Sequence, residues 1–262
     1  MDKILEIIES SSVAHTVYWC NWSKMDYVEH PYAVVMQSEI PNPFFNNIFS
    51  ANIPHSKAQV VVDDLVDRFR SRQVPCFWWS GPVNHDLQIV ELLESHGFAE
   101  VFDAPAMAID LSRELALKRV SAEIIELQNK DQMADWTQTC SAAYGFDETF
   151  SLWWDDLFTN LPFGGSKPLR QILAYCDDKP VATASLFIDN GVASLANVGV
   201  RDGFRRRGIG SAMTITALQI AQALGCRWGV LFSSPMGISM YESIGFRQYG
   251  EGHCYSWSPE SS

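Results

Sequence analysis

The feature that most constrains the fold is a run of three strand-like segments in the second half of the chain. These apolar segments, 169–176, 181–188 and 192–200, are separated by two short turns. The first turn is Asp-Asp-Lys-Pro, and the second is Asp-Asn-Gly, whose Asn-Gly pair favours a type I′ turn. Because strands joined by such tight turns pair antiparallel, the sequence predicts a three-stranded meander.

The segments after the meander alternate between helix and strand patterns. In order they are a loop at 203–210, a helix at 211–224, a strand at 228–232, a short helix at 234–243 and a closing strand at 253–257. Met213, Ala217 and Leu224 recur on one helical face, and Gly225 has the position of a C-terminal cap. This order predicts an α+β fold, with a mixed, mostly antiparallel sheet flanked by helices.

The N-terminal half repeats part of this pattern faintly. The segment 75–82 is an apolar strand that ends in a small residue and proline, as 229–235 does. In each half a helix and then Gly-Phe follow, at Gly97 and at Gly245. The repetition favours a tandem fold: a degenerate first copy without a cofactor loop at 1–115, and a cofactor-binding domain at 116–262. The boundary falls in the region 112–117. Two unrelated segments, or one enlarged domain, are the alternatives.

Composition and charge restrict the classes of partner. The net charge of -12 disfavours nucleic acid and anionic membranes as partners. The chain has no apolar run of 18 residues, and its N-terminal residues lack the apolar core of a secretory signal. Six cysteines without a C-x-x-C pair indicate reduced thiols in a cytoplasmic protein and give no spacing for a metal site.

The strongest chemical signal is the pattern Arg205-x-x-Gly208-x-Gly210 between a strand and a helix. Glycines let the backbone approach a ligand closely, and a helix N-terminus presents free N–H groups to an anion such as a pyrophosphate. Four arginines within seven residues, in a chain that is otherwise acidic, add positive charge there. A Walker A loop needs a Gly-Lys pair, which the chain lacks, and the third glycine or alanine of a dinucleotide-binding fingerprint is also missing.

Two motifs in this half resemble those of the GNAT N-acetyltransferases. Residues 200–211, Val-Arg-Asp-Gly-Phe-Arg-Arg-Arg-Gly-Ile-Gly-Ser, are similar to the motif V-x-P-x-x-R-[GR]-x-G-[IV]-G. Residues 240–246, Met-Tyr-Glu-Ser-Ile-Gly-Phe, resemble the second signature [LM]-Y-x-x-[LI]-G-F. The resemblance covers roughly 140 residues and implies a GNAT fold that uses acetyl-CoA as acyl donor, without a metal. Asp202 replaces a common proline, and Ser234 and Gly237 replace the more usual Asn and Ala.

The resemblance also assigns roles to individual residues. It implies that Tyr241 is a catalytic acid beside the CoA sulfur and that Tyr144 and Phe146 border the acceptor substrate. Asn197, a polar residue of the strand 192–200, is expected to orient the substrate or a water. The residues expected to bind the cofactor are Val198, Gly199, Val200, Arg205, Arg206, Arg207, Gly208, Ile209, Gly210, Ser211, Ser234 and Gly237. The general base stays open, because the strand 192–200 contains no carboxylate. Asp147, Glu148, Asp189, a water chain or an amine that arrives deprotonated are the candidates.

The function expected from these motifs is transfer of an acetyl group from acetyl-CoA to an amine in a ternary complex. The acceptor would be a small molecule or a peptide. The rival interpretations are a non-catalytic acyl-CoA-binding or interaction module and an acyltransferase that uses a longer acyl chain or a hydroxyl acceptor. The sequence does not fix the acceptor, the acyl-chain preference, the oligomeric state or the role of the N-terminal half.

Overall fold

The structure of the chain is a computed structural model that describes residues 2–116 and 119–259. Contacts divide the chain into two units. The N-terminal unit comprises Met1–Ala106, Phe232–Pro235 and Gln248–Ser262, and the C-terminal unit comprises Met107–Leu231 and Met236–Arg247. Each unit is made of more than one segment of the chain, so the two units do not test the predicted domain boundary between residues 115 and 116. That boundary stays a prediction. Leu117, the last residue of the predicted boundary region, lies outside the described residues.

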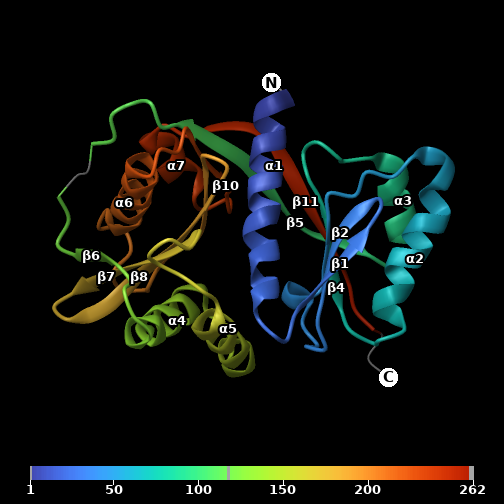
Figure 1. The fold of residues 1–262 in the computed structure, drawn as a ribbon, viewed down its shortest axis with the longest axis horizontal. Helices are drawn as coiled ribbons and strands as arrows, with labels where there is room; N and C mark the ends of the chain where they lie inside the picture. The colour runs from blue at the N-terminus through green and yellow to red at the C-terminus, as the bar shows by residue number, and fades with distance from the viewer. Residues whose placement is uncertain (1, 117–118, 260–262) are drawn as a thin grey trace. The chain divides into compact units, whose positions relative to one another are not determined.

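The N-terminal unit is a sheet with helices on both faces (Figure 1). Its elements are α1 (Asp2–Val17), η1 (Tyr18–Asn21), β1 (Asp26–His30), β2 (Ala33–Gln37), η2 (Pro43–Phe45), β3 (Asn47–Phe49), η3 (His55–Lys57), α2 (Ala58–Arg70), β4 (Cys76–Ser80), α3 (Leu87–Ser95), most of β5 (Ala99–Asp110) and most of β11 (Arg247–Trp257). The strand order β1-β2-β3-β4-β11 is antiparallel except for the parallel pair of β3 and β4.

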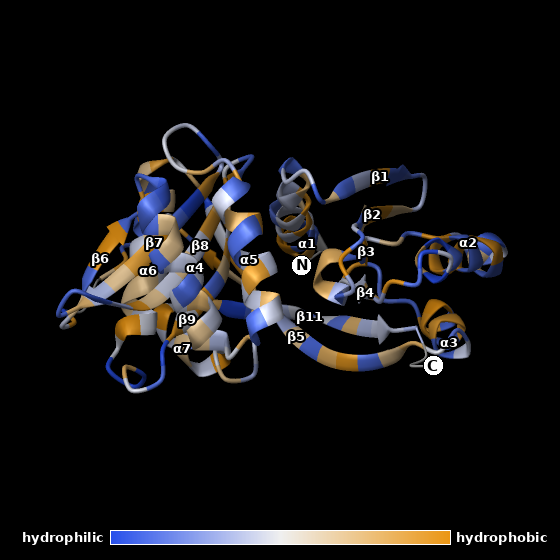
Figure 2. Ribbon diagram, turned by 90° about the horizontal axis from the view of Figure 1, so that it is seen from below, coloured by the Kyte–Doolittle hydropathy of each residue, from blue (hydrophilic) through white to orange (hydrophobic). Residues whose placement is uncertain are grey.

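Strand β4 separates two apolar layers within this unit. Cys76 and Trp78 belong to the core formed with α2 and α3, which includes Val62, Leu65 and Phe69. The intervening residues of the strand point to the opposite face, because side chains alternate along a strand. Helix α1 lies on that opposite face (Figures 1 and 2). Helix α2 carries both hydrophobic and hydrophilic residues, as the orange and blue segments of its ribbon in Figure 2 show.

Helix α1 carries a buried histidine that makes the stability of the chain depend on pH. His15 is 5% exposed, and burial lowers its pKa from 6.5 to about 4. The folded state therefore keeps the imidazole neutral between about pH 6.5 and 4, whereas the unfolded state binds a proton there. The stabilisation is complete above pH 6.5 and is lost as the pH falls towards 4.

We expect the free energy of unfolding to fall by about 3 kcal/mol between pH 7 and pH 4 through this histidine. His15→Leu removes the titrating group and should flatten that part of the profile. Urea unfolding of both proteins across this range is the measurement, and the difference between the two slopes is the readout. Identical slopes would show that His15 does not carry the effect.

The C-terminal unit contains strands in the order β10-β9-β8-β7-β6. Its elements are β6 (Glu123–Glu126), α4 (Lys130–Tyr144), α5 (Glu148–Asn160), β7 (Leu169–Cys176), β8 (Lys179–Asp189), β9 (Val192–Val200), α6 (Ile209–Ala223), β10 (Trp228–Phe232) and α7 (Ile238–Ile244). Strands β6 to β9 are antiparallel neighbours, and β10 pairs parallel with β9. Helix α6 lies on one face of the sheet, and α4 and α5 lie on the other (Figure 1).

The predicted meander is present in this unit, and two helix starts differ from their predicted positions. Helix α6 begins at Ile209, two residues earlier than predicted, because the left-handed Gly208 (φ 77°) turns the chain directly into the helix. Helix α7 begins at Ile238 instead of 234, with Gly237 at its N-cap. The sequence predicts that the strand 253–257 closes the C-terminal half. In the structure this strand pairs antiparallel with β4 and belongs to the N-terminal unit.

Two further predictions concern the cysteines and membrane-spanning helices. The six cysteines are free thiols, and five of them are buried. Among residues 2–116 and 119–259, no helix combines the length and the apolar character that a membrane span requires.

Candidate functional site

The loop between β9 and α6 leaves backbone N–H groups open at a helix N-terminus. Ala212 is the first residue of α6 whose N–H donates within the helix, to the Gly208 carbonyl at 3.0 Å. The N-cap position is Gly208, which has no side chain to accept from the N–H groups of Gly210 or Ser211. The first turn therefore presents donors and the positive end of the helix dipole to a ligand. An anion is the chemistry that this arrangement fits.

Arg205 holds this loop in place. Its Nε donates to the Val200 carbonyl at 2.9 Å, and a terminal nitrogen donates to the Ala143 carbonyl at 2.9 Å. The other terminal nitrogen pairs with Asp202 at 2.9 Å. The guanidinium thus ties the end of β9 to the last turn of α4, which makes Arg205 a positioning residue for the loop.

Replacing Arg205 with alanine is expected to lower the free energy of unfolding by roughly 1–2 kcal/mol, because two backbone carbonyls lose a charged donor. Arg206→Ala is the matched control. Arg206 is the next residue of the same loop and is exposed, so its replacement should leave the stability nearly unchanged. Chemical denaturation of both variants measures the difference in their free energies of unfolding. Equal values would contradict the role of Arg205 as a clamp between the end of β9 and α4.

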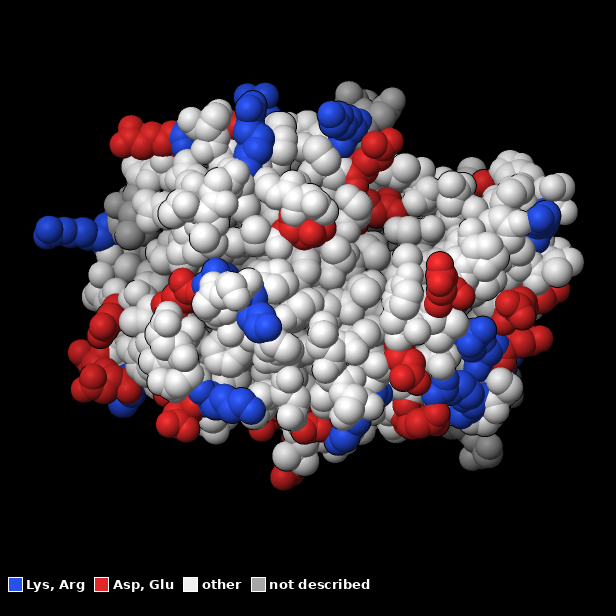
Figure 3. Space-filling model, in the orientation of Figure 1, with Lys and Arg blue, Asp and Glu red and all other residues white. Residues whose placement is uncertain are grey.

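The other two arginines of the loop have different surroundings. Arg206 has a left-handed backbone, with φ 62°, and its side chain is exposed. Arg207 donates to the Gly203 carbonyl at 2.6 Å and lies over the Phe204 ring, 5.1 Å from the centroid. On the face shown in Figure 3, Lys and Arg side chains are interspersed with Asp and Glu side chains. The roles of these arginines in cofactor binding stay predictions.

Strand β9 is irregular where the resemblance places the cofactor. Its pairing with β8 shifts register between Thr183↔Gly199 and Ser185↔Ala196, which is a β-bulge. The parallel pairing with β10 runs only as far as Val230↔Ser194 within the described residues. The backbone of 195–200 thus has β8 on one side and no paired strand on the other. Val198, Gly199 and Val200 lie in this open stretch.

Gly199 allows Tyr144 to lie directly against β9. A Cβ atom at Gly199 would be 2.9 Å from Tyr144 Cε2 and 3.0 Å from Ala143 Cβ. No other residue fits this approach without displacing the end of α4. The predicted cofactor strand and the predicted substrate residue Tyr144 are therefore in contact.

Tyr241 on α7 is buried, with 8% of its surface exposed. Its ring packs edge-on against Phe246, 5.5 Å between centroids. Burial raises the pKa of the Tyr241 phenol well above its usual range. A phenol in this state stays protonated at neutral pH and can donate a proton.

The phenol of Tyr241 is close enough to that of Tyr144 to influence its pKa. Tyr144 as a whole is 48% exposed, but burial of its hydroxyl raises its pKa, and the Cys140 thiol and the Tyr241 phenol raise it further. The structure thus brings together Tyr241, Tyr144 and the open stretch of β9.

Asn197 is held by the sheet. Its backbone is left-handed, with φ 54°, at the bulge of β9. Its Nδ2 donates to Ser185 Oγ at 3.0 Å, and its carbonyl accepts from Thr183 Oγ1 at 2.9 Å. The predicted role of Asn197 in orienting a substrate would therefore use its side-chain oxygen.

Asn197 belongs to a buried polar chain that the sequence analysis missed. Ser185 Oγ donates to Gln171 Oε1 at 2.6 Å, and Gln171, Ser185 and Thr183 are all fully buried. The Nε2 of Gln171 has no partner among the described residues. Polar residues at alternate positions of β8 were the available signal, but such alternation usually indicates a solvent-facing side. Here α4 covers that side.

Phe146 lies in an aromatic group at the start of α5. Its ring stacks on Tyr144 at 5.5 Å and contacts Phe150 edge-on at 4.4 Å between centroids. Phe146 also lines an open groove of about 610 Å³ between α4 and α5, which Glu148 and Asp155 border. A groove with one aromatic ring and two carboxylates in its wall can accept an amine.

The remaining predicted residues are two candidate bases and two residues expected to bind the cofactor. Asp147, a candidate base, is the N-cap of α5 and accepts from the Phe150 N–H at 2.8 Å. Asp189 accepts from the Asn190 amide. Gly237 is the N-cap of α7, whereas Ser234 is exposed and belongs to the N-terminal unit. Its place in a cofactor site stays a prediction.

The sequence matches one protein-family model. Residues 121–246 match the model described as the acetyltransferase (GNAT) family. The match includes the loop, Tyr144, Phe146 and Tyr241. A comparison with curated proteins gives no match.

Solved structures resemble the chain over nearly its full length. The GCN5-related N-acetyltransferase from Kribbella flavida is 17% identical, with a TM-score of 0.73, over 97% of this chain and 95% of that chain. One from Sphaerobacter thermophilus is 16% identical, with a TM-score of 0.64, over 87% and 80%. A tandem GNAT protein from the clavulanic acid biosynthesis pathway is 11% identical, with a TM-score of 0.60, over 91% and 85%. At these identities, the similarity shows the fold.

Proposed function

Residues 121–246 of this chain belong to the acetyltransferase (GNAT) family, and we propose that this acyltransferase domain moves an acetyl group from acetyl-CoA to an amine. The observation that carries the proposal is the open N-terminus of α6 beside the unpaired stretch of β9, with Tyr241 buried nearby. An anion-binding turn suits the pyrophosphate of acetyl-CoA, and an open strand suits its amide-containing arm. Tyr241 supplies an acid for the departing sulfur.

The reaction that this arrangement supports is a direct transfer. The neutral amine attacks the thioester carbonyl carbon, forming a C–N bond, and the C–S bond then breaks. The sulfur leaves with the bonding pair and takes the phenolic proton of Tyr241, while the amine loses its proton to water. A backbone N–H of β9 near Val198 would stabilise the oxyanion of the tetrahedral intermediate. The described residues contain no group of three metal ligands, and no step requires a metal.

The location of the acceptor follows from the same residues. Tyr144, Phe146 and Asn197 lie on the side of the sheet that α4 and α5 cover, and the groove beside Phe146 has acidic walls. A small-molecule or peptide amine is the acceptor class that we propose. The free cysteines support a reducing, cytoplasmic environment, and the N-terminal unit is proposed as a degenerate second copy of the fold.

Thiol release from acetyl-CoA in the presence of an amine panel tests this function. We expect release that depends on the amine and yields the N-acetylated product by mass spectrometry. A series of longer acyl-CoA donors and a set of alcohols separates the acetyl and amine assignments from the alternatives. Tight acetyl-CoA binding without amine-dependent release would instead indicate a non-catalytic binding module.

A further inference from the structure

The N-terminal unit contains a cavity between α1 and its sheet that the acetyl transfer does not use. The cavity has a volume of about 160 Å³. It is lined by residues of α1, β3 and β4 and of the segments around them: Glu9, Ser12, Val13, Thr16, Trp19, Phe44, Asn47, Phe49, Ser50, Phe77, Trp79, Gly81 and Phe232. Cavities of about 150 Å³ hold a molecule the size of benzene.

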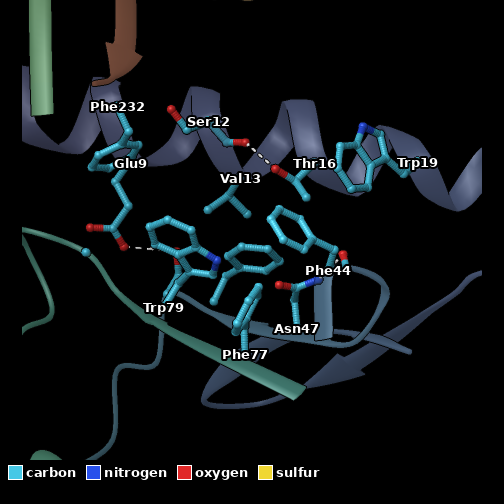
Figure 4. Close-up of a pocket in the computed structure, with 13 residues that line it drawn as sticks. Glu9, Ser12, Val13, Thr16, Trp19, Phe44, Asn47, Phe77, Trp79 and Phe232 are labelled. Carbon is cyan, nitrogen blue, oxygen red and sulfur yellow. Dashed lines mark hydrogen bonds between the residues drawn. The ribbon is translucent and has the colours of Figure 1, made fainter. Parts of the chain in front are cut away.

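Six of the thirteen residues that line the cavity are aromatic. Phe44 and Phe77 meet edge-on at 5.2 Å between centroids, and Trp79 lies 6.2 Å from Phe232. Figure 4 shows the rings of Phe44, Phe77 and Trp79 gathered opposite Val13 of α1, with Phe232 beside Glu9. The cations that stack on aromatic rings in the described part of the chain lie over Trp22, Tyr32, Trp257, Phe204 and Trp228. None of these pairs within the described residues involves Phe77 or Trp79.

A buried carboxylate borders the same cavity. Glu9 is 7% exposed. Its Oε1 accepts from Ser50 Oγ at 3.0 Å and Asn84 Nδ2 at 2.7 Å, and its Oε2 accepts from the Val83 N–H at 3.3 Å. All three donors are neutral, and no Lys, Arg or His among residues 2–116 and 119–259 pairs with it.

The surroundings of Glu9 are shaped around its charge. A Cβ atom at Gly81 would lie 2.2 Å from Glu9 Oε2, so the glycine leaves room for the carboxylate. Ser50 reaches Glu9 from a left-handed backbone, with φ 46°, a conformation that costs energy for a residue other than glycine. Buried charges are normally paired with an opposite charge. Among the described residues no opposite charge pairs with Glu9, and its side chain lines a cavity that also has aromatic side chains in its wall.

We propose that this cavity binds a small organic ammonium ion, with the cationic head near Glu9 and its alkyl groups against Phe77, Trp79 and Phe232. Aromatic faces attract such cations, most strongly when water is excluded. A trimethylammonium head is close in size to benzene and so fits the cavity. The site is independent of the proposed acetyl transfer, because its walls belong to the N-terminal unit and its occupation requires no turnover.

Titration calorimetry of the full chain with two ligands of nearly equal shape tests the proposal. The first is choline, and the second is 3,3-dimethyl-1-butanol, in which carbon replaces the charged nitrogen. We expect choline to bind at least about tenfold more tightly than the neutral analogue. Equal affinities, tighter binding of the neutral analogue, or no heat from choline up to millimolar concentration would each overturn the proposal.

Two variants locate the site. Glu9→Gln keeps the size of the side chain and removes its charge, so choline affinity should fall at least about tenfold while the affinity of the neutral analogue stays the same. Val13→Phe fills the cavity from α1 and should abolish binding of both ligands. Thermal unfolding confirms that each variant is folded. Choline affinity that is unchanged in a folded Glu9→Gln protein would overturn the assignment, and the wild-type comparison decides the question even if that variant fails to fold.

Discussion

Replacing Tyr241 with phenylalanine is expected to lower kcat by about 100-fold or more. The phenol is buried and is protonated at neutral pH, as an ordinary phenol is, so it is available to donate a proton to the departing sulfur of CoA. General acid catalysis of this kind contributes roughly 10²–10⁴-fold. The ring packs against Phe246, and phenylalanine preserves that contact. Steady-state kinetics with saturating acetyl-CoA and the best amine of the panel measures the effect.

The controls for this prediction separate proton donation from binding. The dissociation constant for acetyl-CoA should be the same in Tyr241→Phe and in the wild type, because the cofactor is expected to bind through the loop and β9. Tyr175→Phe is the matched control, since it also removes a phenol with a raised pKa, here one that donates to Asp135. Its kcat should be unchanged. A Tyr241→Phe enzyme that keeps its full kcat would remove the residue from the mechanism.

Gly210→Glu is expected to weaken acetyl-CoA binding at least about 100-fold. The substitution places a negative charge in the first turn of α6, where the pyrophosphate is expected to lie, so the two anions repel and compete for the same N–H groups. The fold should tolerate the change. The nearest atom to a Cβ at Gly210 is Met240 Sδ at 3.2 Å, the flexible end of a side chain, and a carboxylate is favourable at a helix N-terminus.

Two further substitutions at this position distinguish charge from size. Gly210→Ala adds only a methyl group and should retain most of the affinity. Gly210→Gln has the size of glutamate without its charge and should lie between the two. Calorimetric titration with acetyl-CoA at two salt concentrations measures the series, and the deficit of the glutamate variant should shrink at high salt. Equal affinity in the glutamate variant and the wild type would move the pyrophosphate site away from this loop.

Local patterns in the sequence were sufficient to predict much of the C-terminal unit. The turns that end in Lys179-Pro180 and Asn190-Gly191 specify hairpins, and β7, β8 and β9 form the predicted meander. Glycine at 225 and at 245 follows the end of a helix, where the backbone is left-handed. In each case the preference of one or two residues decides the conformation, so neighbours along the chain carry the information.

Features that depend on distant partners could not be predicted in the same way. The apolar strand 253–257 has the same local pattern whichever strand it pairs with, and its pairing with β4 depends on the tertiary fold. The clamp formed by Arg205 joins a loop to an Ala143 carbonyl 62 positions earlier in the chain. The hydrogen-bonded series of side chains from Asn197 to Gln171 could not be predicted, because the sequence does not show which face of β8 is covered.

The central claim, that the C-terminal unit is a working acetyl-CoA site, is tested most directly by the thermal unfolding of the wild-type chain with and without acetyl-CoA. A ligand that binds only the folded state stabilises it by about 2.7 kcal/mol at 100 times its dissociation constant. We expect a clear rise in Tm that grows with acetyl-CoA concentration. An unchanged Tm at millimolar acetyl-CoA would show that the loop is an inert remnant of the fold, and the acetyltransferase proposal would then be wrong.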